Sequence, residues 1–116
     1  MTSSYNAPLH IATPLLASNA FPARAEQRVW LKMDALQPSG SFKLRGIGHA
    51  CATYAARGAR RIVSSSGGNA GLAAAYAARR LGLPALVVVP ETTSARARAL
   101  LAREGAQVLV QGISFQ

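Results

Sequence analysis

The sequence of 116 residues has few of the side chains on which several classes of protein depend. A single cysteine, Cys51, excludes an internal disulfide framework and a zinc site built on cysteines. No apolar run approaches the roughly 20 residues of a membrane span, and the N-terminus lacks the basic and long apolar regions of a secretory signal. These absences predict a cytoplasmic protein without a metal site or a membrane partner.

Acidic residues are also scarce, since four Asp and Glu stand against 13 Lys and Arg and give a formal net charge of +9. A basic balance can indicate nucleic-acid binding, because basic patches gain affinity by releasing the counterions of phosphate groups. Here the arginines form no run longer than two, and aromatic residues are not interleaved with them as in a groove for single strands. Nucleic-acid binding is therefore kept only as the third hypothesis, and acidic residues elsewhere in a longer protein are the other explanation of the charge.

Apolar residues make up 50% of the sequence and charged residues 15%, which argues against disorder. A chain of this length is enough for one compact domain. Its first part, residues 1–27, contains three prolines and little periodicity and predicts an irregular arm. A strand is expected over residues 28–33, followed by a turn over residues 37–41.

From Phe42 to Tyr54 the apolar residues recur at every third or fourth position, which predicts a helix that Ser41 can cap and a left-handed Gly58 can end. The rest of the chain alternates short apolar runs with helical patterns. Strands are expected over residues 61–64, 85–89 and 107–110, and helices over residues 69–81 and from Thr92 or Thr93 to residue 104. This alternation predicts an α/β fold with a mainly parallel sheet flanked by helices. The continuous apolar run 85–89 predicts a strand covered on both faces.

Two loops carry the residues that indicate chemistry. In the first, residues 39–46 (SGSFKLRG), Lys43 lies in the first helical turn, where the helix dipole disfavours a cation by about 0.3–1 kcal/mol. This effect helps a lysine that must lose its proton to attack a carbonyl group, but burial has to supply the rest. Phe42 offers a flat apolar face for an aromatic ring. The simpler alternative is a solvated lysine at a capped helix start.

The second loop, residues 64–71 (SSSGGNAG), consists of small residues whose backbone N–H groups can approach an anion at a helix N-terminus. Its spacing does not fit a dinucleotide fingerprint, and the Gly-Lys-Ser/Thr of a Walker A loop is absent. We interpret it as a carboxylate or phosphate site with Asn69 as an added side-chain donor. The alternative is an ordinary tight turn between a strand and a helix.

Both loops resemble motifs of one known family. Residues 39–46 look like the pyridoxal-phosphate attachment segment of the serine/threonine dehydratases, and residues 65–71 resemble the asparagine loop of the same family. The likeness is greatest to the L-serine dehydratase branch. It runs from about residue 8 to residue 112 and includes shorter matches at residues 31–34, 76–79 and 88–90.

The resemblance implies a fold-type-II enzyme that eliminates water from L-serine or L-threonine and leaves a 2-oxo acid and ammonia. Lys43 would hold pyridoxal 5′-phosphate through a Schiff base, release it to the substrate amine and then take the α-proton. Phe42 would pack on the cofactor ring, and Asn69 would hydrogen-bond its 3′ oxygen. The carboxylate of the small amino-acid substrate would lie against Ser66, Gly67, Gly68, Asn69 and Ala70. The family also implies a homodimer for the full-length form.

Members of this family are considerably longer, and the likeness does not include their glycine-rich loop for the cofactor phosphate or the residue that faces the pyridine nitrogen. Residues 1–40 are therefore expected to be an arm and a strand of the large domain, and residues 41–116 a truncated small α/β domain. A Schiff base without a phosphate anchor is open to water, so we expect little or no dehydratase activity from these residues alone. The second hypothesis is accordingly a non-catalytic truncated fragment or pseudoenzyme.

Four further side chains near the motifs are expected to have structural roles. His49 and Cys51 lie in the predicted helix and are interpreted as packing residues. Arg45 is expected to hold the loop, and Asp34 is expected to be structural rather than a base. Threonine deaminase, serine racemase and cysteine synthase relatives share the lysine, and the preference between serine and threonine stays open.

Overall fold

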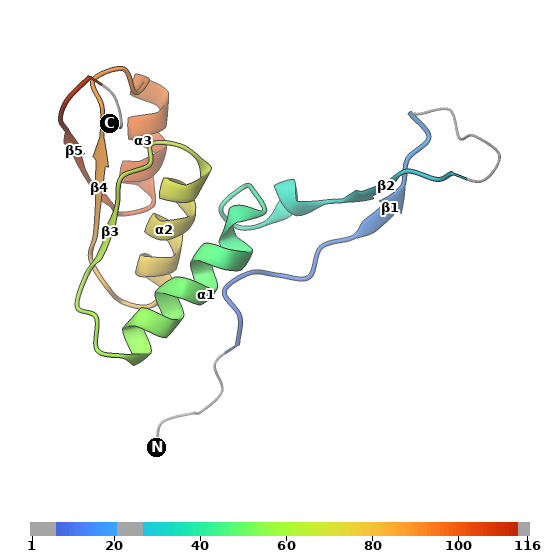
Figure 1. Ribbon diagram of the computed structural model, residues 1–116, viewed down its shortest axis with the longest axis horizontal. Helices are drawn as coiled ribbons and strands as arrows, with labels where there is room; N and C mark the ends of the chain where they lie inside the picture. The colour runs from blue at the N-terminus through green and yellow to red at the C-terminus, as the bar shows by residue number, and fades with distance from the viewer. Residues whose placement is uncertain (1–6, 21–26, 114–116) are drawn as a thin grey trace.

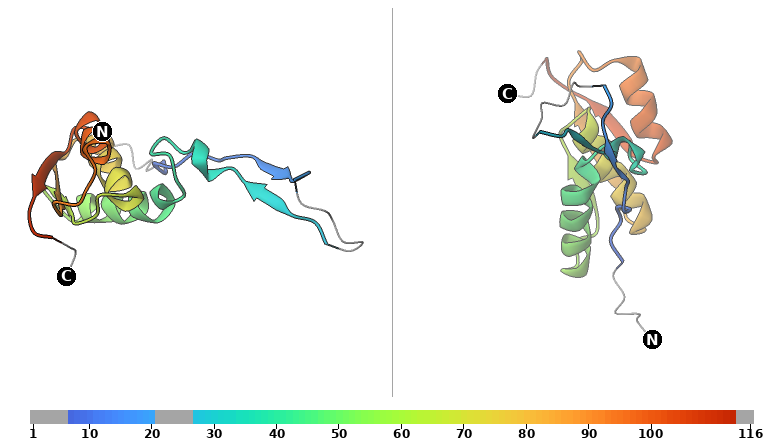
Figure 2. Two further views of the ribbon diagram at one scale, coloured as in Figure 1. Left: turned by 90° about the horizontal axis from the view of Figure 1, so that it is seen from above. Right: turned by 90° about the vertical axis from the view of Figure 1, so that its right-hand side faces the viewer.

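The computed structural model describes residues 7–20 and 27–113, which form two parts of different shape (Figure 1). One part is a layered unit of helices on a parallel sheet, and the other is an antiparallel ribbon that projects away from it (Figures 1 and 2). The chain measures 52 × 46 × 24 Å and has a radius of gyration of 17.0 Å. A compact domain of this length would have a radius of gyration of about 13 Å. The projecting ribbon accounts for the larger value.

The layered unit is built on three parallel strands in the order β3-β4-β5: β3 (Ile62–Ser64), β4 (Ala85–Val89) and β5 (Gln107–Val110). They are connected by two helices, α2 (Asn69–Arg80) and α3 (Ala95–Arg103). Successive right-handed connections that progress in one direction across a sheet place their helices on the same face. Figure 1 shows α2 and α3 on one side of the sheet, as this rule requires. The predicted α/β fold with a mainly parallel sheet is confirmed for the layered unit.

The opposite face of the sheet is open within residues 27–113. In β4, Ala85, Val87 and Val89 are buried, but the alternate residues Leu86 and Val88 are only half-buried. The prediction that this strand is covered on both faces is therefore wrong for the described part of the chain. A continuous apolar run cannot reveal which of its faces has a partner, because that depends on residues far away in the sequence.

The core lies between α2 and its neighbours, where small side chains allow a close approach. Seven residues of α2, at positions 71 and 73–78, are buried, and six of them are glycine or alanine. On one side α2 packs against the sheet, and on the other it packs against α1 (Lys43–Ala56), where Leu44 contacts Ala73 and Tyr76. Close packing of this alanine-rich helix confirms the expectation drawn from its composition.

Helix boundaries agree with the sequence in two places and differ in a third. α1 begins at Lys43, and its end is followed by Gly58 with a φ of 95°, the predicted left-handed conformation. α3, however, is capped by Ser94, whose Oγ accepts a hydrogen bond of 3.1 Å from Ala97 N. The helix therefore starts one or two residues beyond the predicted Thr92 or Thr93.

The N-terminal part is less irregular than predicted. β1 (Leu15–Ala17) pairs antiparallel with β2 (Trp30–Lys32), and a short 3-10 helix, η1 (Asp34–Leu36), leads on to α1. β1 lies inside the expected irregular arm of residues 1–27; the ends of that arm, residues 1–6 and 21–26, lie outside the described residues. The three-residue run Leu15–Ala17 has no alternation of its own, so only the ladder with β2 reveals it as a strand.

A close backbone contact holds the start of α2 against the chain that leaves β3. A Cβ built on Gly71 would lie 1.8 Å from the carbonyl oxygen of Ser66, a distance that no side chain can tolerate. Gly71 is buried in the first turn of α2, and Leu101 Cδ2 lies 3.4 Å from the same built Cβ. Only glycine at this position lets the loop of residues 65–68 fold back onto the helix.

Replacing Gly71 with alanine is expected to destabilise the chain by on the order of 1–3 kcal/mol, because the added methyl group must displace backbone. Gly46→Ala is the matched control, since nothing lies within 4 Å of a Cβ built on Gly46 in α1. Alanine there should be neutral or stabilising by up to about 1 kcal/mol through helix propensity. Urea unfolding followed by circular dichroism measures both; equal effects of the two substitutions would contradict the contact.

Candidate active site

The two loops singled out in the sequence lie in the same region of the layered unit. The loop of residues 65–68 follows the carboxyl end of β3 and leads into α2 at Asn69. Leu44, next to Lys43, packs against Ala73, which is one helical turn or about 6 Å beyond Asn69. The structure therefore brings the first turn of α1 against α2 close to its N-terminus, where a ligand of an open α/β sheet is expected to lie.

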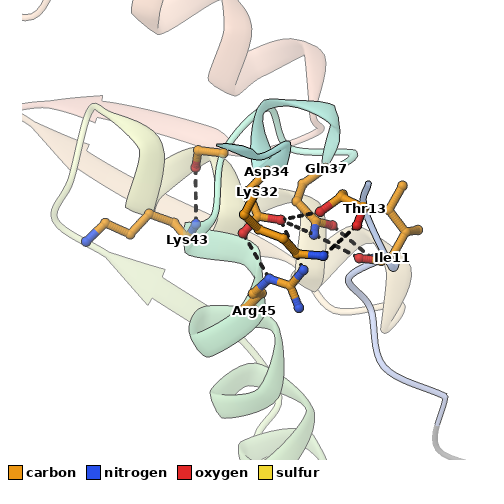
Figure 3. A network of polar contacts seen from close by, with 8 residues as sticks. Ile11, Thr13, Lys32, Asp34, Gln37, Lys43 and Arg45 are labelled. Atoms are coloured by element: carbon orange, nitrogen blue, oxygen red, sulfur yellow. Dashed lines mark hydrogen bonds and ion pairs between the residues drawn. The ribbon is translucent and has the colours of Figure 1, made fainter. Parts of the chain in front are cut away.

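Lys43 and Phe42 are both open to solvent. The side chain of Phe42 is 59% exposed, and Lys43 Nζ lies 5.1 Å from the centroid of its ring. Figure 3 shows the Lys43 side chain extending away from the polar cluster formed by the neighbouring labelled residues. The start of the helix is held locally, because the Lys43 N–H donates to Ser41 Oγ at 3.3 Å. The described residues do not supply the burial that the sequence analysis requires for this amine.

The loop of residues 65–68 keeps its shape through hydroxyl groups of its own. Ser66 N donates to Ser64 Oγ at 3.3 Å, and Gly68 N donates to Ser66 Oγ at 3.2 Å. At the start of α2, no described side chain accepts a hydrogen bond as a cap, and the first turn contains no acidic residue. Such a helix N-terminus offers backbone N–H groups and the positive end of a dipole to an anion.

The five residues expected to contact a substrate carboxylate differ in where their side chains lie. Ser66, Gly67, Gly68 and Asn69 are exposed or half-buried along the loop and the helix start. Ala70 instead directs its side chain toward a cavity of about 460 Å³ between α1 and β3, which Cys51 and Tyr54 also line. Ala70 can therefore contribute to an anion site only through its backbone N–H group.

A cluster of hydrogen bonds around Asp34 connects the arm to the helix that carries Lys43 (Figure 3). Arg45 forms two hydrogen bonds of 3.0 Å with the Asp34 carboxylate, from Nε to Oδ2 and from Nη2 to Oδ1. Thr13 Oγ1 and Gln37 Nε2 donate to Asp34 Oδ1 at 2.8 and 3.1 Å. Because Arg45 lies two residues after Lys43, this cluster fixes the position of the first turn of α1 relative to η1.

Gln37 is the member of this cluster that the sequence analysis missed. It is 3% exposed, and its amide both accepts from Ile11 N and donates to Ile11 O, each at 2.9 Å. Its partner Ile11 is 26 residues away in the sequence, so no local pattern could have indicated the pairing. A polar residue in a turn next to a functional loop was the only available signal.

The charges in this cluster suit a structural role. Hydrogen bonds from Arg45, Gln37 and Thr13 hold the pKa of the Asp34 carboxyl well below its usual range, and the pairing raises the pKa of Arg45. A carboxylate held in this way stays ionised and accepts protons poorly at neutral pH. These contacts agree with the expectation that Asp34 is structural and that Arg45 holds the loop.

The two other residues expected to pack inside α1 behave differently from each other. Cys51 is buried in the core, and burial raises the pKa of its thiol. It is a packing residue, as expected. His49 is exposed on α1, so the expectation of a packing role is wrong for this residue.

Comparison with known proteins identifies the family. Residues 7–116 match the model of the pyridoxal-phosphate dependent enzymes, and the chain belongs to this family. Its parallel sheet and helices are those of the small α/β domain of fold-type-II enzymes, which are pyridoxal-phosphate dependent.

The relatives are named as enzymes of serine and threonine. The human "Serine dehydratase-like" protein is 55% identical over 105 residues, and the human "L-serine dehydratase/L-threonine deaminase" is 56% identical over 105; each match covers 90% of this chain and 32% of the relative. A fungal L-serine ammonia-lyase from Rhizomucor miehei superimposes with a TM-score of 0.79 at 38% identity, covering 91% of this chain and 34% of that one. The chain thus spans about a third of the length of these relatives.

Within residues 7–20 and 27–113, no helix is long and apolar enough to cross a membrane. No group of three or more histidine, cysteine or acidic side chains in these ranges is arranged to hold a metal ion.

The Asp34 cluster predicts a dependence of stability on pH. The folded pKa of Asp34 lies below the value of about 3.9 in an unfolded chain. Its contribution is therefore complete at neutral pH and is lost as the pH falls below about 5 toward the folded pKa. The free energy of unfolding should fall between about pH 5 and pH 3, and less steeply in Asp34→Asn, because the amide does not titrate.

Glu104→Gln provides the control for loss of one negative charge. Glu104 pairs with Arg79, whose side chain is 54% exposed, through one hydrogen bond of 2.8 Å. An exposed pair of this kind contributes little to stability. The measurement is the urea midpoint of each chain at about pH 5 and at about pH 3. If the midpoint fell equally steeply with pH in Asp34→Asn and in the parent chain, the Asp34 cluster would be ruled out as the source of the pH dependence.

Proposed function

We propose that the protein takes part in the pyridoxal-phosphate-dependent elimination of water from L-serine or L-threonine, which yields a 2-oxo acid and ammonia. The observation that carries this proposal is the meeting of two features in one region: an accessible amine beside an aromatic ring at the start of α1, and an uncapped helix start at α2. The choice of reaction is supported by the relatives, which include an L-serine dehydratase/L-threonine deaminase and an L-serine ammonia-lyase.

The residues present fit the cofactor named by the family. An aromatic aldehyde needs an amine that it can reach and a flat surface for its ring, and Lys43 and Phe42 offer both, with Nζ 5.1 Å from the ring centroid. Asn69 is exposed at the start of α2 and has an amide that can donate to a ring oxygen. When bound, pyridoxal phosphate supplies an electron sink for the electron pair released at the substrate α-carbon.

In this proposal the residues of the chain bind, orient and move one proton. Lys43 Nζ holds the cofactor in the resting enzyme and accepts the α-proton of the substrate when its amine is free and neutral. Ser66, Gly67, Gly68, Asn69 and the backbone of Ala70 hold the substrate carboxylate against the start of α2. The helix dipole favours this negative charge by roughly 0.3–1 kcal/mol.

We further propose that residues 1–40 pack on a larger domain of the whole protein and that residues 41–116 form its small domain. Apolar side chains of the β1–β2 ribbon are unusually open: Leu15 is 58% exposed, Trp30 54% and Leu16 49%. A two-stranded ribbon is marginally stable without a partner. The strand register places Leu15 and Trp30 on one face of the ribbon and Leu16 on the other, and exposed apolar side chains on both faces support contact with further protein.

A non-catalytic chain of the same fold is the second candidate. The exposure of Lys43 favours it, because an imine open to water hydrolyses, and catalysis on a carbanion requires a site that excludes water. The two candidates differ in whether Lys43 bonds the cofactor at all and in whether that bond leads to turnover.

Cofactor bonding can be tested sharply, since the chain has only two lysines, Lys32 and Lys43. Addition of pyridoxal phosphate should produce the absorbance of an imine, and reduction with borohydride followed by peptide mass spectrometry should locate the label on Lys43. Lys43→Arg should take up at least about tenfold less label at internal positions, because a guanidinium does not form this bond.

Lys32→Arg is the matched control. The Lys32 ammonium donates a hydrogen bond to the backbone carbonyl of Thr13, so it is engaged in the arm, and its replacement should leave the label on Lys43 unchanged. The α-amino group also reacts with aldehydes, and mass spectrometry distinguishes it as a label on the first peptide. Equal labelling of both lysines would remove the support for a specific site.

Turnover is the separate measurement. With pyridoxal phosphate and L-serine, we expect the 116-residue chain to release keto acid at a rate close to that of the free cofactor, because Lys43 is exposed to water. Coupled reduction of the keto acid follows the reaction. Robust turnover that Lys43→Arg abolishes would show that these residues suffice for catalysis and would dismiss the non-catalytic candidate.

A further inference from the structure

Thr93 lies directly against the loop proposed to hold the substrate carboxylate. A Cβ built on Gly67 would meet Thr93 Cγ2 at 3.0 Å and Thr93 Oγ1 at 3.3 Å, with Val89 Cγ1 also at 3.3 Å. A methyl group at Gly67 would therefore fit only if Thr93 or the loop moved by a few tenths of an ångström. The loop of residues 65–68 and the turn that carries Thr93 also line one hollow at the sheet edge.

The turn that carries Thr93 is held firmly by its surroundings. The Thr93 N–H donates to Pro90 O at 3.0 Å, and Pro90 is buried at the end of β4. The guanidinium of Arg98 donates to the carbonyl oxygens of Thr93 and Glu91, at 3.1 and 2.9 Å. One side chain of α3 thus binds both ends of the turn, so Thr93 presents a fixed surface to Gly67.

The other side of the same loop is fixed as well. The carbonyl group of Ser66 lies so close to Gly71 that a methyl group there would overlap it. The loop is therefore confined between the first turn of α2 on one side and Thr93 on the other. Because the Thr93 side chain lies on the side of the loop opposite Gly71, its size bears on where the loop comes to rest.

We propose that Thr93 is a positioning residue for the carboxylate-binding loop: its γ-methyl group sets how far Gly67 can move toward α3. The distance between the loop N–H groups and a bound carboxylate then depends on a side chain that touches neither cofactor nor substrate. The proposal rests on the proposed function only in that the loop of residues 65–68 and the start of α2 bind a carboxylate.

The methyl and hydroxyl groups of Thr93 can be tested separately. Thr93→Ser removes only Cγ2, the atom at 3.0 Å, whereas Thr93→Val keeps a methyl group there and replaces the hydroxyl. Gly67→Ala adds a methyl group 3.0 Å from Thr93 Cγ2, closer than side chains normally approach. The probe is acetate at constant ionic strength, and the readout is its dissociation constant from the amide NMR shifts of residues 66–70.

Positioning by the γ-methyl group predicts a specific pattern of affinities. Gly67→Ala should weaken acetate binding about three- to tenfold, as should Thr93→Ser, while Thr93→Val stays within about twofold of the parent chain. Combining Gly67→Ala with Thr93→Ser should recover most of the affinity, because the new methyl group occupies the space of the lost one. Gly67→Ala with Thr93→Val should not recover it.

The outcomes separate this proposal from the proposed function. If acetate shifts none of the amides of residues 66–70 in the parent chain, the carboxylate site and the role of Thr93 are both refuted. If acetate binds but Thr93→Ser leaves its affinity unchanged, or rescue is equal with serine and valine, only the role of Thr93 is refuted. Should Gly67→Ala fail to fold, the single variants at Thr93 decide the question. Urea unfolding of each variant shows whether affinity changes merely follow stability.

Discussion

The close approach between the start of α2 and the chain leaving β3 is the contact on which the rest of the structure depends. Gly71 permits it, and the Ser66 carbonyl lies where any side chain at that position would be. The alanines that follow extend the same close packing along the helix, against the sheet on one side and α1 on the other. As a consequence, the N–H groups at the start of α2 lie at the carboxyl edge of the sheet, where the first turn of α1 is also packed.

A second constraint comes from the opposite end of the site. The Asp34 cluster joins the arm to α1 through the paired hydrogen bonds of Arg45, and it places Lys43 without touching the lysine side chain. The two halves of the candidate site are thus positioned by different means: one by close packing of small residues, the other by a charged pair with further hydrogen bonds. Both supports lie behind the groups that would meet a ligand, which leaves Lys43, Phe42 and Asn69 accessible.

The accessibility of these groups agrees with the size of the chain. It spans about a third of the length of its relatives, and the sheet, the ribbon and the lysine all have faces that the described residues leave open. In this proposal a second domain would close over the site. It would cover the apolar side chains of the ribbon and exclude water from Lys43. Under the proposed function, this chain would form one wall of a cleft.

Local signals in the sequence were enough to place most of the layered unit. Periodicity, glycine and proline located α1, α2, β4 and β5 almost to the residue, and they placed Lys43 and Asn69 at helix starts. Three features could not be obtained in this way: the pairing of β1 with β2, the bonds of Gln37 to Ile11 and of Thr13 to Asp34, and the contact of Thr93 with Gly67. Each joins residues 13 or more positions apart in the chain. The sequence by itself determined the helices and strands and the residue types at their ends, because these follow from interactions within a few residues. The tertiary structure alone decided which side chains meet and which stay exposed, because that depends on how distant segments pack.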